Sequence, residues 1–176
     1  MQKELPNSAT VNDVFASSDT NAKADILSGI NSGPMLVNYL GHGSVGVWSG
    51  DGILFDEQDA DALTNGSHLP VFLSIDCLNG YFEDPVPSPE SLAVELMLAK
   101  NGGAVAVWAS SGLTSAGPQF QMDRALVRAI FSAPSPALGD AIQAAKSGIS
   151  DSDVRRTYIL FGDPLLHLSW PGTAHK

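Results

Sequence analysis

The chain has little cysteine, little positive charge and no long apolar run. Its 176 residues contain one cysteine, Cys77, which excludes an internal disulfide and a zinc site built from several cysteines. The 9 Lys and Arg residues face 19 Asp and Glu residues, and a formal net charge of -10 repels phosphate backbones, so we expect no nucleic-acid partner. No segment reaches the roughly 20 apolar residues of a membrane-spanning helix, so we expect no membrane span.

The rest of the composition is typical of a folded α/β domain, with 44% hydrophobic and 16% charged residues. Short apolar runs alternate with helical patterns, which predicts a mostly parallel sheet with helices on both faces. We expect a domain over 18–170, an N-terminal segment over 1–17 and a loose tail over 171–176. The predicted elements are strands over 35–40, 69–75, 104–110 and 155–161, helices over 18–31, 56–65, 91–103, 121–132 and 136–148, and loops over 41–52, 79–90 and 111–119.

Polar residues follow all four predicted strands, at the edge of the sheet where ligands usually bind. They are Gly-His-Gly at 41–43, Asp-Cys at 76–77, Ser-Ser-Gly at 110–112 and Gly-Asp at 162–163. A histidine, His42, and the only cysteine, Cys77, therefore follow successive strands. We expect these two side chains to be neighbours in space.

The glycines at 41, 43 and 46 fit G-x-G-x-x-G, the pattern of a dinucleotide-binding turn. Such a turn must open directly into a helix whose N-terminus faces the pyrophosphate. Here VWSGDG follows, with two more glycines, and a phosphate cradle has no use for His42. We therefore interpret the turn as one that presents an imidazole, with a purely structural turn histidine as the plainer alternative.

Cysteine and histidine together form a nucleophilic pair. The imidazole can take or hold the thiol proton and later protonate a leaving amine. Gly43 has no side chain and can bring its N–H close to a substrate. The N–H groups of Gly43 and Cys77 would then form an oxyanion hole. The plainer alternative for Cys77 is a small buried hydrophobic residue.

Several blocks of the sequence resemble the gingipain-like cysteine peptidases. NYLGHGS (38–44) is similar to their histidine block, and VFLSIDCLNGYF (71–82), with its Cys-x-Asn-Gly-x-Phe stretch, to their cysteine block. GGAVAVWASSGLTS (102–115) and FGDPLLHL (161–168) resemble later strands of the same domain. The resemblance covers about residues 20–169. It implies a three-layer caspase-like fold, here without its first strands, and a thiol protease that needs no cofactor.

The resemblance also assigns functions to particular residues. It implies that Cys77 attacks the peptide bond, that His42 handles the proton, and that Ser110, Ser111 and Gly112 bind the substrate, a peptide or protein. It implies a secreted or cell-surface parent protein. The alternative function is an inactive caspase-like binding or scaffold module that keeps the Cys77 and His42 pair.

The family's catalytic domain is about twice as long as this chain, so its first strands and the acidic partner of the histidine would precede Met1. The strand predicted over 35–40 (MLVNYL) carries no charge or proline, which is typical of a central strand buried on both faces. Left uncovered, it would invite association. We expect a homodimer joined near this strand, a partner chain such as the other half of the domain, or a fold-back of 8–16 as a covering strand.

Other polar residues have plainer interpretations. An acidic cluster could hold calcium as a structural ion, but a capped, solvated helix explains it more simply. We interpret Asp76 as a solvated acid at a strand end, Asp163 as a turn residue, and Trp48 and Trp108 as core residues. The members of the acidic cluster are Asp56, Glu57, Asp59 and Asp61.

Overall fold

The computed structural model describes residues 2–49, 52–83, 90–132 and 135–170. The helices are η1 (Gln2–Glu4), α1 (Ala22–Asn31), α2 (Glu57–Asp61), α3 (Leu92–Leu98), α4 (Ala116–Ile130), α5 (Leu138–Ser147) and α6 (Ser152–Thr157). The strands are β1 (Leu36–Leu40), β2 (His42–Ser44), β3 (Val47–Ser49), β4 (Ile53–Asp56), β5 (Val71–Ile75), β6 (Ala106–Ser110) and β7 (Tyr158–Phe161).

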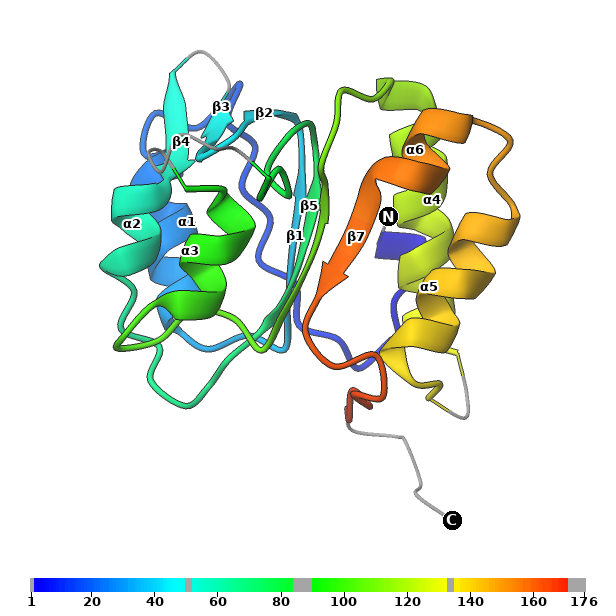
Figure 1. Cartoon of the computed structure of the whole chain (residues 1–176). Helices are drawn as coiled ribbons and strands as arrows, with labels where there is room; N and C mark the ends of the chain where they lie inside the picture. The colour runs from blue at the N-terminus through cyan, green and yellow to red at the C-terminus, as the bar shows by residue number, and fades with distance from the viewer. Residues whose placement is uncertain (1, 50–51, 84–89, 133–134, 171–176) are drawn as a thin grey trace.

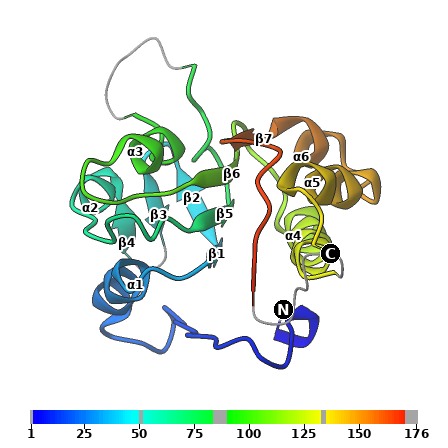
Figure 2. The ribbon, with the colours of Figure 1, turned by 90° about the horizontal axis from the view of Figure 1, so that it is seen from below.

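Four strands form the main sheet in the order β1-β5-β6-β7. β1, β5 and β6 run parallel, and β7 runs antiparallel to β6. Helices α1 to α3 lie on one side of this sheet and α4 to α6 on the other (Figure 1 and Figure 2). The predicted α/β fold class, with a mostly parallel sheet between two helical layers, is confirmed.

The two central strands, β5 and β6, are buried along their whole length. This explains why VFLSI and AVWAS are almost wholly apolar instead of alternating with polar residues. Each face of the sheet carries its own apolar cluster, one against α4 and α5 and one against the helices of the opposite layer. Trp108 lies in the first cluster and Trp48 in the second, both almost fully buried, so their predicted place in the core is confirmed.

The segment predicted as a loop over 41–52 was wrong in part, because it forms most of a second, antiparallel sheet in the order β2-β3-β4. The strands are very short, and the glycines within and between them are typical of loops, so the sequence did not predict these strands. The sheet is anchored by Trp48, whose ring stacks on Tyr39 at 4.4 Å and packs against Phe55 at 4.9 Å. These aromatic contacts bury the middle of β3 although the strand has only three residues.

The helix predicted over 121–132 begins earlier, at Ala116, within the segment predicted as a loop. Pro118 lies in the first turn, where a missing N–H costs no helical hydrogen bond. The Gly-Pro pair at 117–118 therefore did not mark a loop. Four other helices are confirmed but shorter than predicted, namely α1, α2, α3 and α5.

The strand predicted over 155–161 was wrong at its start, because residues 155–157 complete α6. Asp151 caps this helix by accepting hydrogen bonds from the N–H groups of Asp153 and Val154. β7 begins only at Tyr158 and runs antiparallel to β6, so Gly162 and Asp163 follow it at the opposite edge of the sheet, and their predicted place beside the other strand ends was wrong. Further on, Asp163 accepts a hydrogen bond from the N–H of Leu165 at 2.8 Å, which confirms its turn function.

β1 is the last strand on one side of the main sheet within the described residues. It is only partly buried, with Asn38 and Leu40 exposed, so the expectation of burial on both faces was wrong. No strand forms over 8–16, and Val11 and Phe15 are exposed, so the predicted fold-back does not cover this edge.

The first residues of the chain are attached more firmly than a loose terminus. Glu4 accepts hydrogen bonds from Arg124 and Arg128 on α4, both at 2.8 Å, and these guanidinium groups lower the pKa of Glu4 to about 2. The predicted loose tail, 171–176, lies outside the described residues. Among the helices that the structure describes, none is long and apolar enough to cross a membrane.

Candidate active site

His42 stands at the start of β2, directly after a sharp turn at the end of β1. The N–H of Gly41 donates to the carbonyl of Ile75 at 3.3 Å, and the Tyr39 hydroxyl donates to the carbonyl of His42 at 2.7 Å. These bonds fix the backbone of the turn while the histidine itself remains exposed. A strand and not a helix follows, so the glycine pattern lacks the helix N-terminus of a dinucleotide site.

Cys77 lies two residues beyond the end of β5 and is partly exposed, so it is not a buried core residue. The next residue, Leu78, has φ of 66° and is the one non-glycine residue with positive φ in the described part of the chain. Such a conformation is strained for a branched side chain and often occurs at functional turns. The turn therefore holds the thiol at the rim of the sheet.

The turns that carry His42 and Cys77 lie against each other. β1 and β5 are paired in register as Leu40 with Ile75, so both residues stand two positions beyond the paired ends. The amide of Asn79 then donates to the carbonyl of Ser44, and to that of Val47 at 3.2 Å. The cysteine turn is thus bonded directly to the hairpin that carries the histidine.

Asp76 is fully buried, so its interpretation as a solvated acid was wrong. Both carboxyl oxygens lack a hydrogen-bond partner among the described residues, and burial raises the pKa of Asp76 well above its ordinary value. The side chain lies directly against Gly43, where any Cβ would collide with the carboxyl group. Only glycine therefore fits at Gly43 while Asp76 occupies this position.

The segment 110–112 lies beside the cysteine turn, since the N–H of Leu78 donates to the carbonyl of Gly112 at 3.3 Å. Ser110 is buried, and its hydroxyl lies within hydrogen-bond distance of the Gly112 carbonyl and the Thr157 hydroxyl, so this side chain serves the fold. Ser111 donates its N–H and its hydroxyl to the carbonyl of Thr157 and is partly exposed, as is Gly112. The part of the segment open to a ligand is therefore 111–112.

Sequence reasoning missed three residues that position these turns. Asn79 had a signal, because it belongs to the Cys-x-Asn-Gly-x-Phe stretch. Gln119 and Tyr158 had none: one lay in a predicted loop and the other in a predicted strand. Both donate hydrogen bonds to the carbonyl of Asp76.

Two residues of the acidic cluster, Asp56 and Asp59, stabilise the start of α2. Asp56 accepts hydrogen bonds from the N–H groups of Gln58 and Asp59, and the Asp59 carboxylate accepts one from the N–H of Asp56. Lys23 forms ion pairs with both carboxylates, at 3.5 and 2.7 Å. Within the described residues, no group of three or more His, Cys, Asp or Glu could hold a metal ion. Bound calcium remains a prediction.

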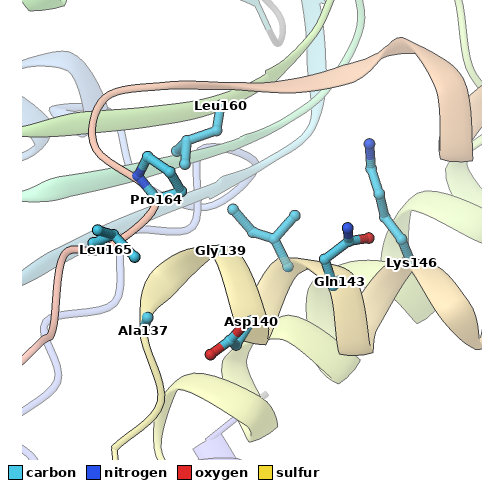
Figure 3. A pocket seen from close by; sticks show the side chains of 9 residues that line it. Ala137, Gly139, Asp140, Gln143, Lys146, Leu160, Pro164 and Leu165 are labelled. Atoms are coloured by element: carbon cyan, nitrogen blue, oxygen red, sulfur yellow. The ribbon is translucent and has the colours of Figure 1, made fainter.

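A cavity of about 400 Å³ lies away from these turns, between α5 and the chain around β7 (Figure 3). Lys146 and Gln143 line it from the helix, and Leu160, Pro164 and Leu165 from the opposite side. Neither His42 nor Cys77 contributes to it.

The comparisons with known proteins point to one family. A family model described as Peptidase family C25 matches residues 1–169. The chain belongs to this family of gingipain-like cysteine peptidases. Among curated C25 relatives, Gingipain R2 of Porphyromonas gingivalis is 35% identical over 88 residues, which are 49% of this chain and 12% of the relative. Gingipain R1 of the same species is also 35% identical over 88 residues, which are 9% of its length.

Solved structures agree with the C25 assignment. The crystal structure of gingipain R, described as an Arg specific cysteine proteinase, has a TM-score of 0.76 and 25% identity, and the match covers 86% of this chain and 37% of that one. A second structure, described as a protease, has a TM-score of 0.74 and 18% identity over 96% of this chain and 41% of that one, which supports the fold alone. These matches therefore span less than half of the length of each of the four relatives.

Proposed function

We propose that this C25 chain carries the catalytic pair of a cysteine endopeptidase. Cys77 is the nucleophile and His42 the proton carrier. The observation that carries the proposal is the direct bonding of their two turns, through Asn79 to Ser44 and through Gly41 to Ile75. A partly exposed thiol on a strained turn, which is bonded to the hairpin that carries an exposed imidazole, suits attack on a carbonyl better than packing.

The reaction follows from these positions. Cys77 Sγ adds to the peptide carbonyl carbon as the thiol proton passes to His42. The N–H groups of Gly43 and Cys77 stabilise the resulting oxyanion, worth roughly 3 kcal/mol for one well-placed donor. The C–N bond then breaks, and the leaving amine takes the proton from His42. Water adds to the thioester, which releases the acid product and restores the thiol.

Substrate contacts belong to the segment next to the thiol. Ser110, Ser111 and Gly112 form the proposed substrate-binding stretch, in which Ser111 and Gly112 are the partly exposed members. The free edge of β1 is the proposed place where further strands of the same domain, or a second copy of the chain, pair. We also propose a secreted or cell-surface location for the parent protein, as the resemblance to the gingipains implies.

The experiment is covalent labelling with a panel of peptidyl chloromethyl ketones, including one that ends in arginine because gingipain R is described as Arg specific. Since Cys77 is the only cysteine, each alkylation of a thiol reports on one atom. We expect labelling of Cys77, slowed about 100-fold or more in His42→Ala. His167→Ala, which changes another exposed histidine, should label at the normal rate.

The contrary result is labelling no faster than that of a free cysteine, and equal in His42→Ala. It would favour the inactive binding or scaffold module.

A further inference from the structure

Three side chains converge on the carbonyl oxygen of Asp76. Gln119 Nε2 donates to it at 2.9 Å, the Tyr158 hydroxyl at 3.0 Å and the Thr114 hydroxyl at 3.5 Å. Gln119 lies in the first turn of α4 and is 3% exposed, and Tyr158 begins β7 and is fully buried. A carbonyl oxygen has two lone pairs, so these donors saturate it.

This carbonyl shares its peptide bond with the N–H of Cys77. Because the peptide unit is planar and trans, the C=O of Asp76 and the N–H of Cys77 point in opposite directions. Donors that hold the carbonyl on one side therefore direct the N–H to the other. The Cys77 N–H has no acceptor among the described residues. An oxyanion donor must be unpaired in this way, so that it can bind the substrate oxygen.

Asp76 also contacts the second proposed oxyanion donor. Its buried carboxyl group lies against Gly43, on the neighbouring turn. Asp76 thus connects the two proposed oxyanion donors. Gln119 and Tyr158 fix its carbonyl, and its carboxyl group contacts Gly43. A rotation of the Asp76–Cys77 peptide would disturb the N–H of Cys77 and the support of Gly43 together.

Gln119 lies beside the nucleophile as well. Its Nε2 is 3.8 Å from Cys77 Sγ, and the N–H of Thr114 donates to the same sulfur at 3.4 Å. Buried as it is, Gln119 is placed to act on the geometry around Cys77 and not on the substrate itself.

We propose that Gln119, with Tyr158, is a positioning residue that aims the Cys77 N–H into the oxyanion hole. The inference rests on the proposed peptidase function and deepens it. The rival explanation is that Gln119 only ties α4 to the end of β5. The two differ in one respect: aiming affects chemistry that uses an oxyanion, whereas a structural tie affects stability alone.

The experiment compares two reagents on the full chain. A peptide aldehyde ending in arginine forms a hemithioacetal: Sγ bonds to the aldehyde carbon, the C=O double bond becomes a single bond, and the thiol proton ends on that oxygen. This adduct uses the oxyanion hole. Iodoacetamide alkylates the same sulfur by displacing iodide and needs no oxyanion donor. A change in aldehyde binding without a change in the iodoacetamide rate therefore reports on the orientation of the Cys77 N–H.

Gln119→Met keeps the volume of the side chain and removes its N–H donors. We expect it to weaken aldehyde binding about tenfold, as for one lost hydrogen bond, while the iodoacetamide rate stays within about twofold. Tyr158→Phe removes the other strong donor to the same carbonyl and should act in the same direction. Gln121→Met, an exposed glutamine on the same helix, is the matched control and should change neither response.

Aldehyde binding that is normal in both Gln119→Met and Tyr158→Phe, with or without a lower melting temperature, would overturn the inference and leave the peptidase proposal intact. An equal fall in both reagents would also overturn it, because that indicates general loss of the site. Aldehyde binding that is the same in wild type and Cys77→Ala would overturn the peptidase proposal itself, and the inference with it.

Discussion

The buried carboxyl group of Asp76 is the least expected side chain at the site. An acid without hydrogen-bond partners is stable in such a place only in its neutral form, which explains the raised pKa. An ionised Asp76 would also repel an ionised Tyr39. Burial is the larger cause of the raised pKa of Tyr39, and the charge of Asp76 is the second cause. Asp76 therefore makes the folded state less stable as the pH rises from the unfolded towards the folded pKa of this group.

Replacing Asp76 with asparagine removes this titration. The folded pKa lies above the unfolded one, so the stability that the neutral acid provides is complete below about pH 3.9 and is lost as the pH rises towards the folded pKa. We therefore expect Asp76→Asn to become more stable relative to wild type as the pH rises, by up to about 1.4 kcal/mol per pH unit in that window. Urea unfolding at several pH values measures the difference.

Asp123→Asn provides the internal comparison, because burial raises the pKa of Asp123 to about 7. The gain in unfolding free energy of Asp123→Asn over wild type should therefore increase with pH and stop increasing near pH 7. A constant difference between Asp76→Asn and wild type from pH 4 to pH 8 would show that Asp76 does not titrate in this way.

At the scale of single residues, the sequence could indicate the chemistry but not the burial. His42 between two glycines and a lone cysteine after an apolar run were visible patterns. Asp76 looked like a solvated acid because nothing in its neighbours reveals that the hairpin β2–β3 covers it. Gln119 gave no signal, since its partner is a backbone carbonyl far away in the sequence.

Among the elements, α2 supports the β2–β3 hairpin that carries the histidine. The N–H of Glu57, its first residue, donates to the carbonyl of Gly46 at 3.0 Å. A capping box between Asp56 and Asp59 holds this end of the helix, and Lys23 of α1 bridges both carboxylates. A helix of five residues depends on such terminal contacts because it has few hydrogen bonds of its own.

Removing the N-cap of α2 should therefore lower the stability of the whole domain. We expect Asp56→Ala to lower the free energy of unfolding by about 1 kcal/mol, the usual cost of a lost N-cap. Asp61→Ala changes an exposed acid at the other end of the same helix and should stay within about 0.5 kcal/mol of wild type. Thermal unfolding followed by circular dichroism measures both, and equal effects of the two changes would contradict the capping argument.

Long apolar runs made the central strands predictable, because full burial leaves little room for polar residues. The three strands of the small sheet were not predictable from their residues, since Trp48 stabilises them through rings that come from other elements. The start of α4 was hidden for a different reason: Gly117 and Pro118 usually break helices but are tolerated in a first turn.

For the whole molecule, β1 and β7 are the two edge strands of the main sheet within the described residues, and β1 is the one that the sequence predicted to be central. β1 pairs with β5 on one side only, and Leu40, 47% exposed, lies at its end. An apolar strand with unpaired N–H and C=O groups is a template for another strand. The expectation of association through 35–40 therefore stays a prediction.

A single charge should block such pairing. We expect the chain to associate at high concentration in light scattering, and Leu40→Lys to shift it to the monomer. Leu165→Lys, which replaces an even more exposed leucine beyond β7, should leave association unchanged. A wild-type chain that scatters as a clean monomer throughout would exclude self-association and leave pairing with another chain segment.

The bonds on the Asp76 carbonyl join residues that are far apart along the chain, by 43 positions to Gln119 and 82 to Tyr158. Closing loops of that length is entropically costly and slows folding. Both donors follow Cys77 in the order of synthesis. A nascent chain thus carries an ordinary cysteine, and its oriented N–H arises only when β7, the last of the strands in the described residues, docks beside β6.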